Sequence, residues 1–494
     1  MKRFLLVIVG CLALLAGVLV FNTSRSMNRV AVRDGGKVAA VTVDSAGAIA
    51  RFAKALTYPT ISWDPGTQPV DSAAFRGLQA HLAESFPLVH KTLKHEVINH
   101  LSLLYTWPGT DPTRAPVVLM GHQDVVPVIP GTESQWQQQP FSGAVKDGFV
   151  WGRGALDDKL TVLATLEAIE TLIRDGYKPR HTVYLAFGHD EEIGGEQGAQ
   201  VLRDTLVARG LKEAALVLDE GGAIADGAML GVTGKVALIG VSEKGFLSLE
   251  LTMKGKGGHS STPPPHTAIG QIASVIEKIE AAPFPATLDG PTRWMLDAVA
   301  PTMPFGKRLA MANLWLFGPL VEKAMLAQPQ SAAMLRTTTA VTMVSGGVKT
   351  NVLPIDAKAV VNFRIRPGET MASVTDRVRG IVNDTNVAIR DLGFHTEPSP
   401  VSDREGAGFK ALAKSVREEF GASGVTVAPY LVIGGTDARY WSGRSTQTFR
   451  FMGAPIEADG MTRVHGTNER APLGSYVSSV RYLVRLVRNT DEIP

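Results

Sequence analysis

Three apolar segments of the chain each end in acidic or imidazole side chains, which are groups that bind divalent metal ions. The segments are Val117–Asp124, Tyr184–Glu192 and Leu216–Gly222. Each has the length and composition of a buried parallel strand. In open α/β sheets the ligand site lies outside the carboxyl ends of the strands, so these side chains are predicted to meet in one crevice. They are His122, Asp124, Glu191, Glu192 and Asp219.

Two other segments extend this set of candidate metal ligands. The loop Trp151–Lys159 contains Asp157 and Asp158, and His465 lies in a loop flanked by glycine near the C-terminus. Mixed nitrogen and oxygen ligands of this kind suit a dinuclear zinc site, and the single cysteine excludes a thiolate site. An isolated acidic pair is usually solvated or lies at a helix N-terminus. Several converging carboxylates, however, would repel one another without a cation, so the pattern predicts a metal site.

Three strings within these segments resemble motifs of the co-catalytic zinc aminoacylase and carboxypeptidase family. They are Gly121–Pro127, Gly152–Lys159 and Asp190–Gly195. The resemblance covers nearly the whole chain after residue 45, and its other segments are Gly257–Ser261, Asn351–Pro354, Asn362–Gly368 and the loop of His465. Within the family, Leu335–Ala340 and the long insertion before it most resemble the branch of carboxypeptidase S and N-fatty-acyl-amino-acid synthase/hydrolase.

The resemblance implies two zinc ions per chain and assigns their ligands. Asp157 would bridge the two ions. His122 and Asp219 would complete the protein ligands of one ion. Glu192 and His465 would complete those of the other. Two zinc ions about 3.5 to 4 Å apart can hold a hydroxide and polarise a scissile carbonyl, so the implied reaction needs no Ser or Cys nucleophile.

The same resemblance implies the reaction and the residues that move protons. Glu191 would be the general base, free of the metals. Asp124 would accept the second ring N–H of His122 and fix its tautomer. The implied reaction is hydrolysis by metal-bound hydroxide of the amide bond next to an amino acid with a free carboxylate. The substrates would be N-acyl amino acids, including long-chain ones, or short peptides.

His259 is the candidate for stabilising the oxyanion. A lone histidine beside glycines is more often a surface loop residue, and that is what the residues alone indicate. In related enzymes the matching histidine comes from a lid domain, often that of a partner subunit, and hydrogen-bonds the developing oxyanion. A homodimer is compatible with this role.

Arg364 is the candidate for binding the free carboxylate of the substrate. The alternation in Val360–Arg366 shows only that Arg364 lies on one face of a strand, which could be a solvated face. The resemblance makes Arg364, with Asn351 nearby, a binder of carboxylate through its planar fork, and Gly435 a further substrate contact. Family members often have Asp in place of Asn362, which leaves Arg366 as an alternative to Arg364.

Length and composition fit a two-domain enzyme. A chain of 494 residues that is 45% hydrophobic can bury more than one core. The expected fold class is α/β, with a zinc-peptidase catalytic domain built on a central, mostly parallel sheet and an inserted α+β, ferredoxin-like lid domain. The net charge of +3 argues neither for nor against an anionic partner, but the sequence has no basic stripe interleaved with aromatics, which argues against nucleic acid. The expected parts are a signal anchor or signal peptide (1–25), a tether (26–42), the catalytic domain in two pieces (43–244 and 399–494) and a lid or dimerisation domain between them (245–398).

The N-terminus predicts export. Lys2 and Arg3 precede an uninterrupted apolar run, Phe4–Phe21. As a helix this run would extend about 27 Å, close to the roughly 30 Å hydrocarbon core of a bilayer. No clear small-x-small cleavage site follows, which favours an uncleaved anchor with its basic end in the cytoplasm over a cleaved signal peptide. Either way the enzyme would lie on the periplasmic, extracellular or lumenal side, as a membrane-anchored or secreted protein.

The insertion at about residues 282–334 is rich in Met, Leu and aromatic side chains. It could pack a helical elaboration of the lid or a subunit contact, or it could form an apolar groove or membrane-facing surface that receives a lipid acyl chain. Two alternatives for the whole chain stay open. One is a strict carboxypeptidase on short peptides. The other is a non-catalytic, zinc-binding, membrane-tethered interaction protein, against which Glu191 argues because a binding module needs no free base.

Overall fold

A nine-stranded sheet forms the centre of the larger domain. The computed structural model describes residues 2–27, 38–64 and 66–494. The strand order is β1-β2-β6-β3-β7-β17-β9-β16, and β8 pairs with β9 outside this path. The central strands β6, β3, β7 and β17 run parallel, so their carboxyl ends meet at one edge, as predicted. The strands are β1 (Lys94–Ile98), β2 (Ser102–Trp107), β3 (Val117–His122), β6 (Val183–Gly188), β7 (Leu216–Asp219), β8 (Ile224–Asp226), β9 (Lys235–Glu243), β16 (Thr426–Val432) and β17 (Thr448–Arg450).

Helices cover both faces of this sheet, which explains why its strands are continuous apolar runs rather than alternating ones. Successive side chains of a strand point to opposite faces. Leu119 therefore lies in one apolar cluster, while Met120 lies in another. The first face is covered by α2 (Ser45–Ala55), α3 (Ser72–Ser85), α4 (Pro87–Thr92), α5 (Lys159–Arg174), α13 (Ala407–Phe420) and α15 (Leu473–Thr490). The second is covered by α6 (Ala199–Ala208) and the short helix η6 (Asp437–Trp441).

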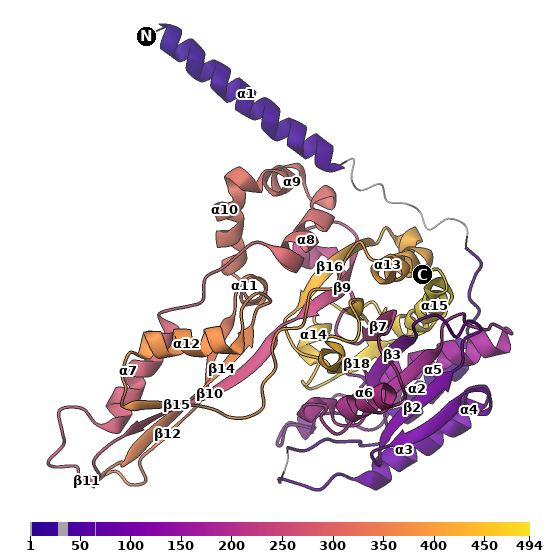
Figure 1. The fold of residues 1–494 in the computed structure, drawn as a ribbon, viewed down its shortest axis with the longest axis horizontal. Coiled ribbons are helices and arrows are strands. Elements are labelled where there is room, and N and C mark those ends of the chain that lie inside the picture. The colour runs from indigo at the N-terminus through magenta and orange to yellow at the C-terminus, as the bar shows by residue number, and fades with distance from the viewer. Residues whose placement is uncertain (1, 28–37, 65) are drawn as a thin grey trace.

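The smaller domain is a four-stranded antiparallel sheet with two helices, and it extends away from the large sheet (Figure 1). Its strand order is β12-β14-β10-β15, and its chain order is strand, helix, two strands, helix, strand. This is the ferredoxin-like arrangement, so the predicted fold class is confirmed. The elements are β10 (Gly245–Lys254), α7 (Ala268–Glu280), β12 (Thr338–Gly346), β14 (Asp356–Ile365), α12 (Met371–Val382) and β15 (Val387–Asp391). The tip carries a two-stranded ribbon, β11 (Gly258–His259) with β13 (Val352–Leu353).

The helical insertion within the lid span packs on the large sheet instead of in the lid core. Its helix α8 buries Met295 and Val299 in one apolar cluster with Val236 of β9 and Ala428 of β16. The expected lid, 245–398, therefore contains a segment that belongs by its packing to the catalytic domain. The helices are α8 (Gly290–Val299), η4 (Ala300–Thr302), α9 (Phe305–Ala312), α10 (Leu314–Leu326) and α11 (Pro329–Leu335).

The N-terminal helix α1 (Lys2–Met27) projects from the molecule (Figure 1). Among the described residues it is the one helix whose length and composition would let it cross a membrane, over Lys2–Arg25. The end of α1 contacts α9 and η4. Residues 28–37 of the predicted tether lie outside the described part of the chain.

A small three-stranded sheet connects two distant segments of the chain. Its strands are β4 (Ala144–Lys146), β5 (Phe149–Trp151) and β18 (Arg470–Pro472). Arg470 pairs with Trp151, so the loop that precedes β18 lies beside the loop that follows β5. These two loops carry His465 and Asp157, respectively.

Candidate metal centre

The carboxyl ends of the parallel strands deliver most of the predicted site residues. His122 is the last residue of β3, and Glu192 lies in the short helix η2 (Glu191–Ile193) that follows β6. Asp157 comes from the loop between β5 and α5. His465 comes from the loop between α14 (Gly460–Arg463) and β18. Four segments that are distant in sequence thus converge at one edge of the sheet.

Asp157 faces two imidazoles with its two carboxylate oxygens. Its Oδ1 lies 2.9 Å from Nε2 of His122, and its Oδ2 lies 3.1 Å from Nε2 of His465. The same nitrogen of His465 lies 3.0 Å from Oε2 of Glu192. A carboxylate with a different imidazole at each oxygen has the geometry of a bridging ligand. The arrangement therefore fits the predicted pair of metal sites that share Asp157.

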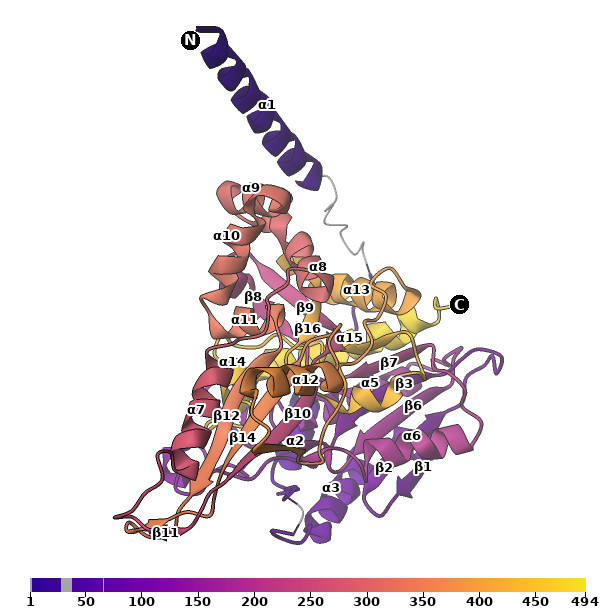
Figure 2. The same cartoon turned by 60° about the vertical axis from the view of Figure 1, so that its left-hand side comes forward.

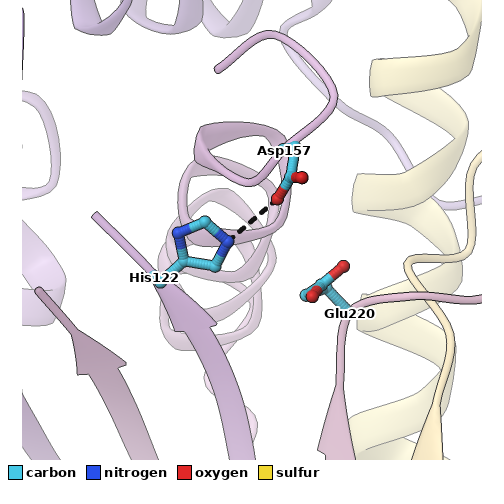
Figure 3. A group of neighbouring side chains, drawn as sticks. All are labelled: His122, Asp157 and Glu220. Atoms are coloured by element: carbon cyan, nitrogen blue, oxygen red, sulfur yellow. Dashed lines mark hydrogen bonds and ion pairs between the residues drawn. The ribbon is translucent and has the colours of Figure 1, made fainter. Parts of the chain in front are cut away.

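The structure groups Glu220, and not Asp219, with His122 and Asp157. Ligand atoms of His122, Asp157 and Glu220 all lie within 4.8 Å of one another (Figure 3). Asp219 accepts backbone hydrogen bonds with both oxygens, from Ala438 at 2.7 Å and from Glu220 at 3.0 Å. The geometry thus differs from the assignment of Asp219 as a ligand. The acid next to it in sequence points into the site instead.

The electrostatics of the site also fit a bound cation. Burial and the charge of Asp157 raise the pKa of Glu192 to about 7. Burial, followed by Asp157 and its acidic neighbours, raises the pKa of Glu220 well above its ordinary range. Hydrogen bonds to Asp157 and Glu192 raise the pKa of His465 to about 10. The carboxylates of this site repel one another, so without a cation they take up protons, and the imidazole keeps its own. Divalent ions would supply the positive charge that these protons now provide.

Asp124 orients both the first histidine and the pair of glutamates. Its backbone carbonyl lies 3.0 Å from Nδ1 of His122, and its carboxylate Oδ1 lies 3.3 Å from the same nitrogen. Its two carboxylate oxygens also accept the backbone N–H groups of Glu191 and Glu192, at 3.2 and 3.1 Å. The predicted contact with the ring of His122 is thus present, although the carbonyl is nearer. Asp158, for which no ligand role is predicted, accepts the backbone N–H of His122 at 3.2 Å.

Glu191 lies beside the ligand groups but belongs to neither of them. Its Oε1 is 3.8 Å from Nη1 of Arg439. Burial and the nearby charge of Asp437 raise the pKa of Glu191 well above its ordinary range. A buried carboxyl group with a raised pKa, close to metal ligands, has the properties of a group that accepts and returns a proton.

Glu469 is a buried residue of the site that the sequence does not single out. Its carboxylate accepts hydrogen bonds from Nη1 of Arg153 at 2.7 Å and from the backbone N–H groups of Gly154, Leu156 and Asp157 at 2.8 to 3.2 Å. Arg153 also donates to the carbonyl of His465 at 3.2 Å. Glu469 and Arg153 therefore hold the loops of Asp157 and His465 together.

The guanidinium groups of Arg364 and Arg439 lie near Glu191, and the side chain of Arg439 is largely buried. Arg364 packs over the ring of Phe246, with its Cζ 4.7 Å from the ring centroid. Its pKa is lowered by burial and by the positive charge of Arg439, while Glu191 acts in the opposite direction. Arg439, which the sequence does not single out, donates to the carbonyl of Gly194 at 2.8 Å.

Gly435 and the alternatives to Arg364 can also be placed. A Cβ at Gly435 would lie only 3.4 Å from Nη1 of Arg439, so this predicted substrate contact borders the guanidinium. Arg366 forms an ion pair with Asp289 and is thereby engaged elsewhere. Asn362 donates to the hydroxyl of Ser248 on the neighbouring strand at 3.1 Å. These contacts favour Arg364 over Arg366.

His259 and Asn351 lie at the opposite end of the lid from Arg364. The backbone carbonyl of Asn351 accepts from the N–H of Ser260, so Asn351 is a neighbour of His259. From Asp356 to Arg364, β14 extends roughly 26 Å at about 3.3 Å per residue. The expectation that Asn351 is near Arg364 is therefore wrong within one chain, because the β12–β14 hairpin separates the two residues by the length of its strands. His259 is exposed at the tip, away from the metal ligands of its own chain (Figure 1).

Comparison with known proteins agrees with this geometry. Residues 118–489 match the family described as peptidase family M20/M25/M40. The chain is 36% identical over 446 residues to the N-fatty-acyl-amino acid synthase/hydrolase PM20D1 of Xenopus tropicalis, which covers 89% of this chain and 85% of that protein. It is also 36% identical over 445 residues to the probable carboxypeptidase S-like 2 of Dictyostelium discoideum, with 90% and 85% covered.

A solved structure shows the same fold. The M20 family metallo-carboxypeptidase Sso-CP2 from Sulfolobus solfataricus superposes with a TM-score of 0.66 at 19% identity, covering 90% of this chain and 99% of that one. The family match spans most of the sequence, and each of the two relatives carries an enzyme's name and is matched over 85% of its own length. The chain therefore belongs to peptidase family M20/M25/M40 and is a metallohydrolase of the carboxypeptidase and aminoacylase type.

Proposed function

We propose that this chain hydrolyses the amide bond next to an amino acid with a free carboxylate, using two zinc ions that share Asp157. The observation that carries the proposal is that the two oxygens of Asp157 each face a different imidazole. One ion would be held by His122, Asp157 and Glu220, and the other by Asp157, Glu192 and His465. When bound, the ions would activate the attacking water and polarise the scissile carbonyl.

Glu191 is the residue we assign to proton transfer. It is adjacent to both ligand groups without belonging to either, so its carboxylate is free to take a proton from the attacking water. It would then return that proton to the leaving amine. Asp124 supports this role, because its carboxylate fixes the backbone of Glu191 and Glu192. With the backbone fixed, the side chain of Glu192 can bind the metal while that of Glu191 stays free to act as the base.

Arg364 and Arg439 are the groups we assign to the free carboxylate of the substrate. Burial and the positive charge of Arg439 lower the pKa of Arg364, and a bound anion would offset this repulsion between the two guanidinium groups. Stacking on Phe246 fixes Arg364 and leaves its planar fork available for a bidentate contact. Gly435 allows the backbone to approach Arg439, so a substrate could contact this loop closely.

His259 would act in the site of a second copy of the chain. Its place at the tip of the lid keeps it away from the metal ligands of its own chain, but a symmetric dimer could bring it to its partner's site. There the imidazole would donate a hydrogen bond to the developing oxyanion. The same tip carries Asn351, whose side chain would reach the partner's substrate and not the one beside Arg364.

Export and anchoring by α1 complete the proposal. The helix is long and apolar enough to span a bilayer, and its basic end precedes the apolar run. Asn22 near its end donates to Asn313 of the folded domain at 2.9 Å. A segment that makes a specific contact with the mature domain is better explained as a retained anchor than as a cleaved signal peptide.

Assays of the full chain with N-acyl amino acids and dipeptides test the proposed reaction and substrate. Similarity to an N-fatty-acyl-amino acid synthase/hydrolase supports long acyl groups. Each buried methylene contributes roughly 0.8 kcal/mol, so kcat/KM should rise steeply from acetyl- to octanoyl- to oleoyl-phenylalanine below their micelle concentrations. Glu191→Gln provides the background rate. A flat or falling series with active dipeptide cleavage would favour a strict carboxypeptidase, and release of no amine from any substrate would overturn the proposal.

A further inference from the structure

The helical hairpin of α9 and α10 lies close to the point where α1 meets the folded domain (Figure 2). It carries exposed apolar side chains. Phe305 begins α9 and is 56% exposed. Trp315, Leu316 and Leu320 of α10 are 63%, 43% and 63% exposed. Single exposed apolar residues are common, but Leu316 and Leu320 lie one turn apart on one side of α10, and Trp315 adjoins them. The hairpin thus presents an apolar face that no other described part of the chain covers.

Asn313, the residue between the two helices, joins the hairpin to α1. It is fully buried, and its amide donates to the carbonyl of Leu19 at 3.1 Å. In return it accepts from the side chain of Asn22 at 2.9 Å. A buried amide that is satisfied by groups of both elements fixes their relative position, because breaking the contact would leave polar groups unpaired.

The contact between Asn313 and α1 determines how deep the hairpin lies relative to a bilayer that α1 spans. The apolar run of α1 ends at Phe21, and Leu19 and Asn22 lie within one turn of that end. If α1 spans the membrane, the hairpin lies at the boundary between acyl chains and headgroups. Trp is enriched at this boundary. Trp315 has the required character, since its indole N–H donates to Asn313 at 3.3 Å while its ring is exposed.

The charges and shape of the hairpin fit the same location. Lys307 of α9 and Lys323 of α10 are exposed and could reach anionic headgroups. The acid on these helices, Glu322, is half-buried. A groove of about 750 Å³ opens beside the exposed leucines on α10, with Trp315 and Lys323 in its lining. Apolar side chains flanked by lysines are typical of a helix that lies in a membrane interface.

We propose that the α9–α10 hairpin is a second membrane contact, which lies in the interfacial layer next to α1 and holds the catalytic domain in one orientation at the bilayer surface. The inference rests on the proposed anchoring by α1 and goes beyond it, because an anchor on a polar tether alone would leave the domain free to turn. The occupant of the apolar face is therefore lipid.

Fluorescent labels at single cysteines of the full chain in vesicles test this inference. Native Cys11 lies within α1 and reports on the anchor itself. In a Cys11→Ser background, Leu316→Cys and Leu320→Cys report on the hairpin. Val97→Cys is the matched control, since Val97 is 53% exposed on β1, at the opposite edge of the large sheet from β16. Vesicles that contain phosphatidylglycerol, with and without a lipid-borne quencher, supply the bilayer.

Labels at 316 and 320 are expected to show blue-shifted emission that is lost with the lipid-borne quencher, as at Cys11, while the label at 97 keeps the emission of a water-exposed dye. If the label at Cys11 is quenched and those at 316 and 320 stay in water, the anchor stands and the inference is overturned. Blue-shifted emission at 316 and 320 without quenching by lipid would show that a second copy covers this face. Absence of quenching at Cys11 would overturn both the anchor and the hairpin contact.

Discussion

The carboxylate of Glu469 accepts the backbone N–H of Asp157 at 3.2 Å, so the residue that bridges the two proposed metal sites is held by an acid that is not itself a ligand. The same carboxylate oxygen accepts the N–H of Leu156 at 2.8 Å. Its other oxygen accepts from Gly154 and from Arg153. Because β18 places Glu469 next to this loop, the position of Asp157 depends on a part of the chain more than three hundred residues away.

Replacement of Glu469 by Gln is therefore expected to weaken zinc binding without removing a ligand. The side-chain amide of Gln would place an N–H group where an oxygen now accepts hydrogen bonds from backbone N–H groups. It would also leave Arg153 without its counter-charge. Loss of one partner of a buried pair costs about 3 to 5 kcal/mol, and loss of groups that support metal ligands commonly lowers affinity about 10- to 100-fold. Zinc content in metal-buffered dialysis and the Tm measure the two effects.

Glu457→Gln is the matched control for this prediction. Glu457 pairs with Arg470 in the same region, at 3.0 and 3.1 Å, but among the described residues it forms no hydrogen bond or ion pair with the loop of Asp157. It should keep full zinc content. An unchanged zinc affinity in Glu469→Gln would show that the loop of Asp157 holds its position without this carboxylate.

A pair of substitutions separates Glu220 from Asp219 as the metal ligand. Glu220→Gln should lower the zinc content from two ions per chain to about one, because one of the His122, Asp157 and Glu220 ligands is weakened. Asp219→Asn should keep both ions and lose about 1 to 3 kcal/mol of stability, since it would place an N–H group against the backbone donors of Ala438 or Glu220. Zinc per chain by elemental analysis and the free energy of unfolding distinguish the two. The reverse pattern would restore Asp219 as the ligand.

Most of the fold and site can be predicted from the sequence because the signals are local. The apolar runs that become β3, β6 and β7 end in metal-binding side chains, and parallel strands bring such ends together. The choice between Asp219 and Glu220 is different. It depends on which of two adjacent side chains faces the crevice, and therefore on the residue at which β7 ends.

Other features depend on contacts between segments that are distant in sequence. Glu469 is a lone acid in a polar loop, and only the pairing of β18 with β5 gives it a role. Arg439 becomes part of the site because η6 packs beside the carboxyl end of β7. The insertion is recognisable as apolar from its sequence. Its helix α8, however, packs against β16, a strand that lies more than a hundred residues later in the chain, so the position of α8 cannot be predicted locally.

Zinc affinity should rise with pH, because the metal-free site holds protons that the ions must displace. The pKa of His465 is about 10 and that of Glu192 about 7 in the metal-free site, so at pH 7 the imidazole is protonated. Binding of an ion to this pair releases at least one proton, and the apparent affinity should rise about tenfold or more per pH unit between pH 6 and 8. Chelator competition measures this slope.

Calorimetry in two buffers of different ionisation enthalpy counts the protons that are released on binding. His465→Ala should bind fewer zinc ions and release fewer protons, while the exposed His259→Ala should behave like the unaltered chain. A slope that is flat across this range, or one that His465→Ala leaves unchanged, would mean that another group holds the proton.

Hybrid dimers test whether His259 acts in the site of its partner. Glu191→Gln should keep both zinc ions while turnover falls by about 10² to 10⁴, since only the proton acceptor is lost. His259→Ala should also be inactive. If each site combines Glu191 of one chain with His259 of the other, a hybrid of these two variants contains one intact site, and dimers purified through two different tags should regain about half of the normal activity.

A hybrid of Glu191→Gln with Asp157→Ala is the control, because both of its sites carry a defect whichever chain supplies His259. Recovery in neither hybrid would place His259 outside the partner's site. Equal recovery in both would point to contamination with active enzyme, because the parental dimers are inactive.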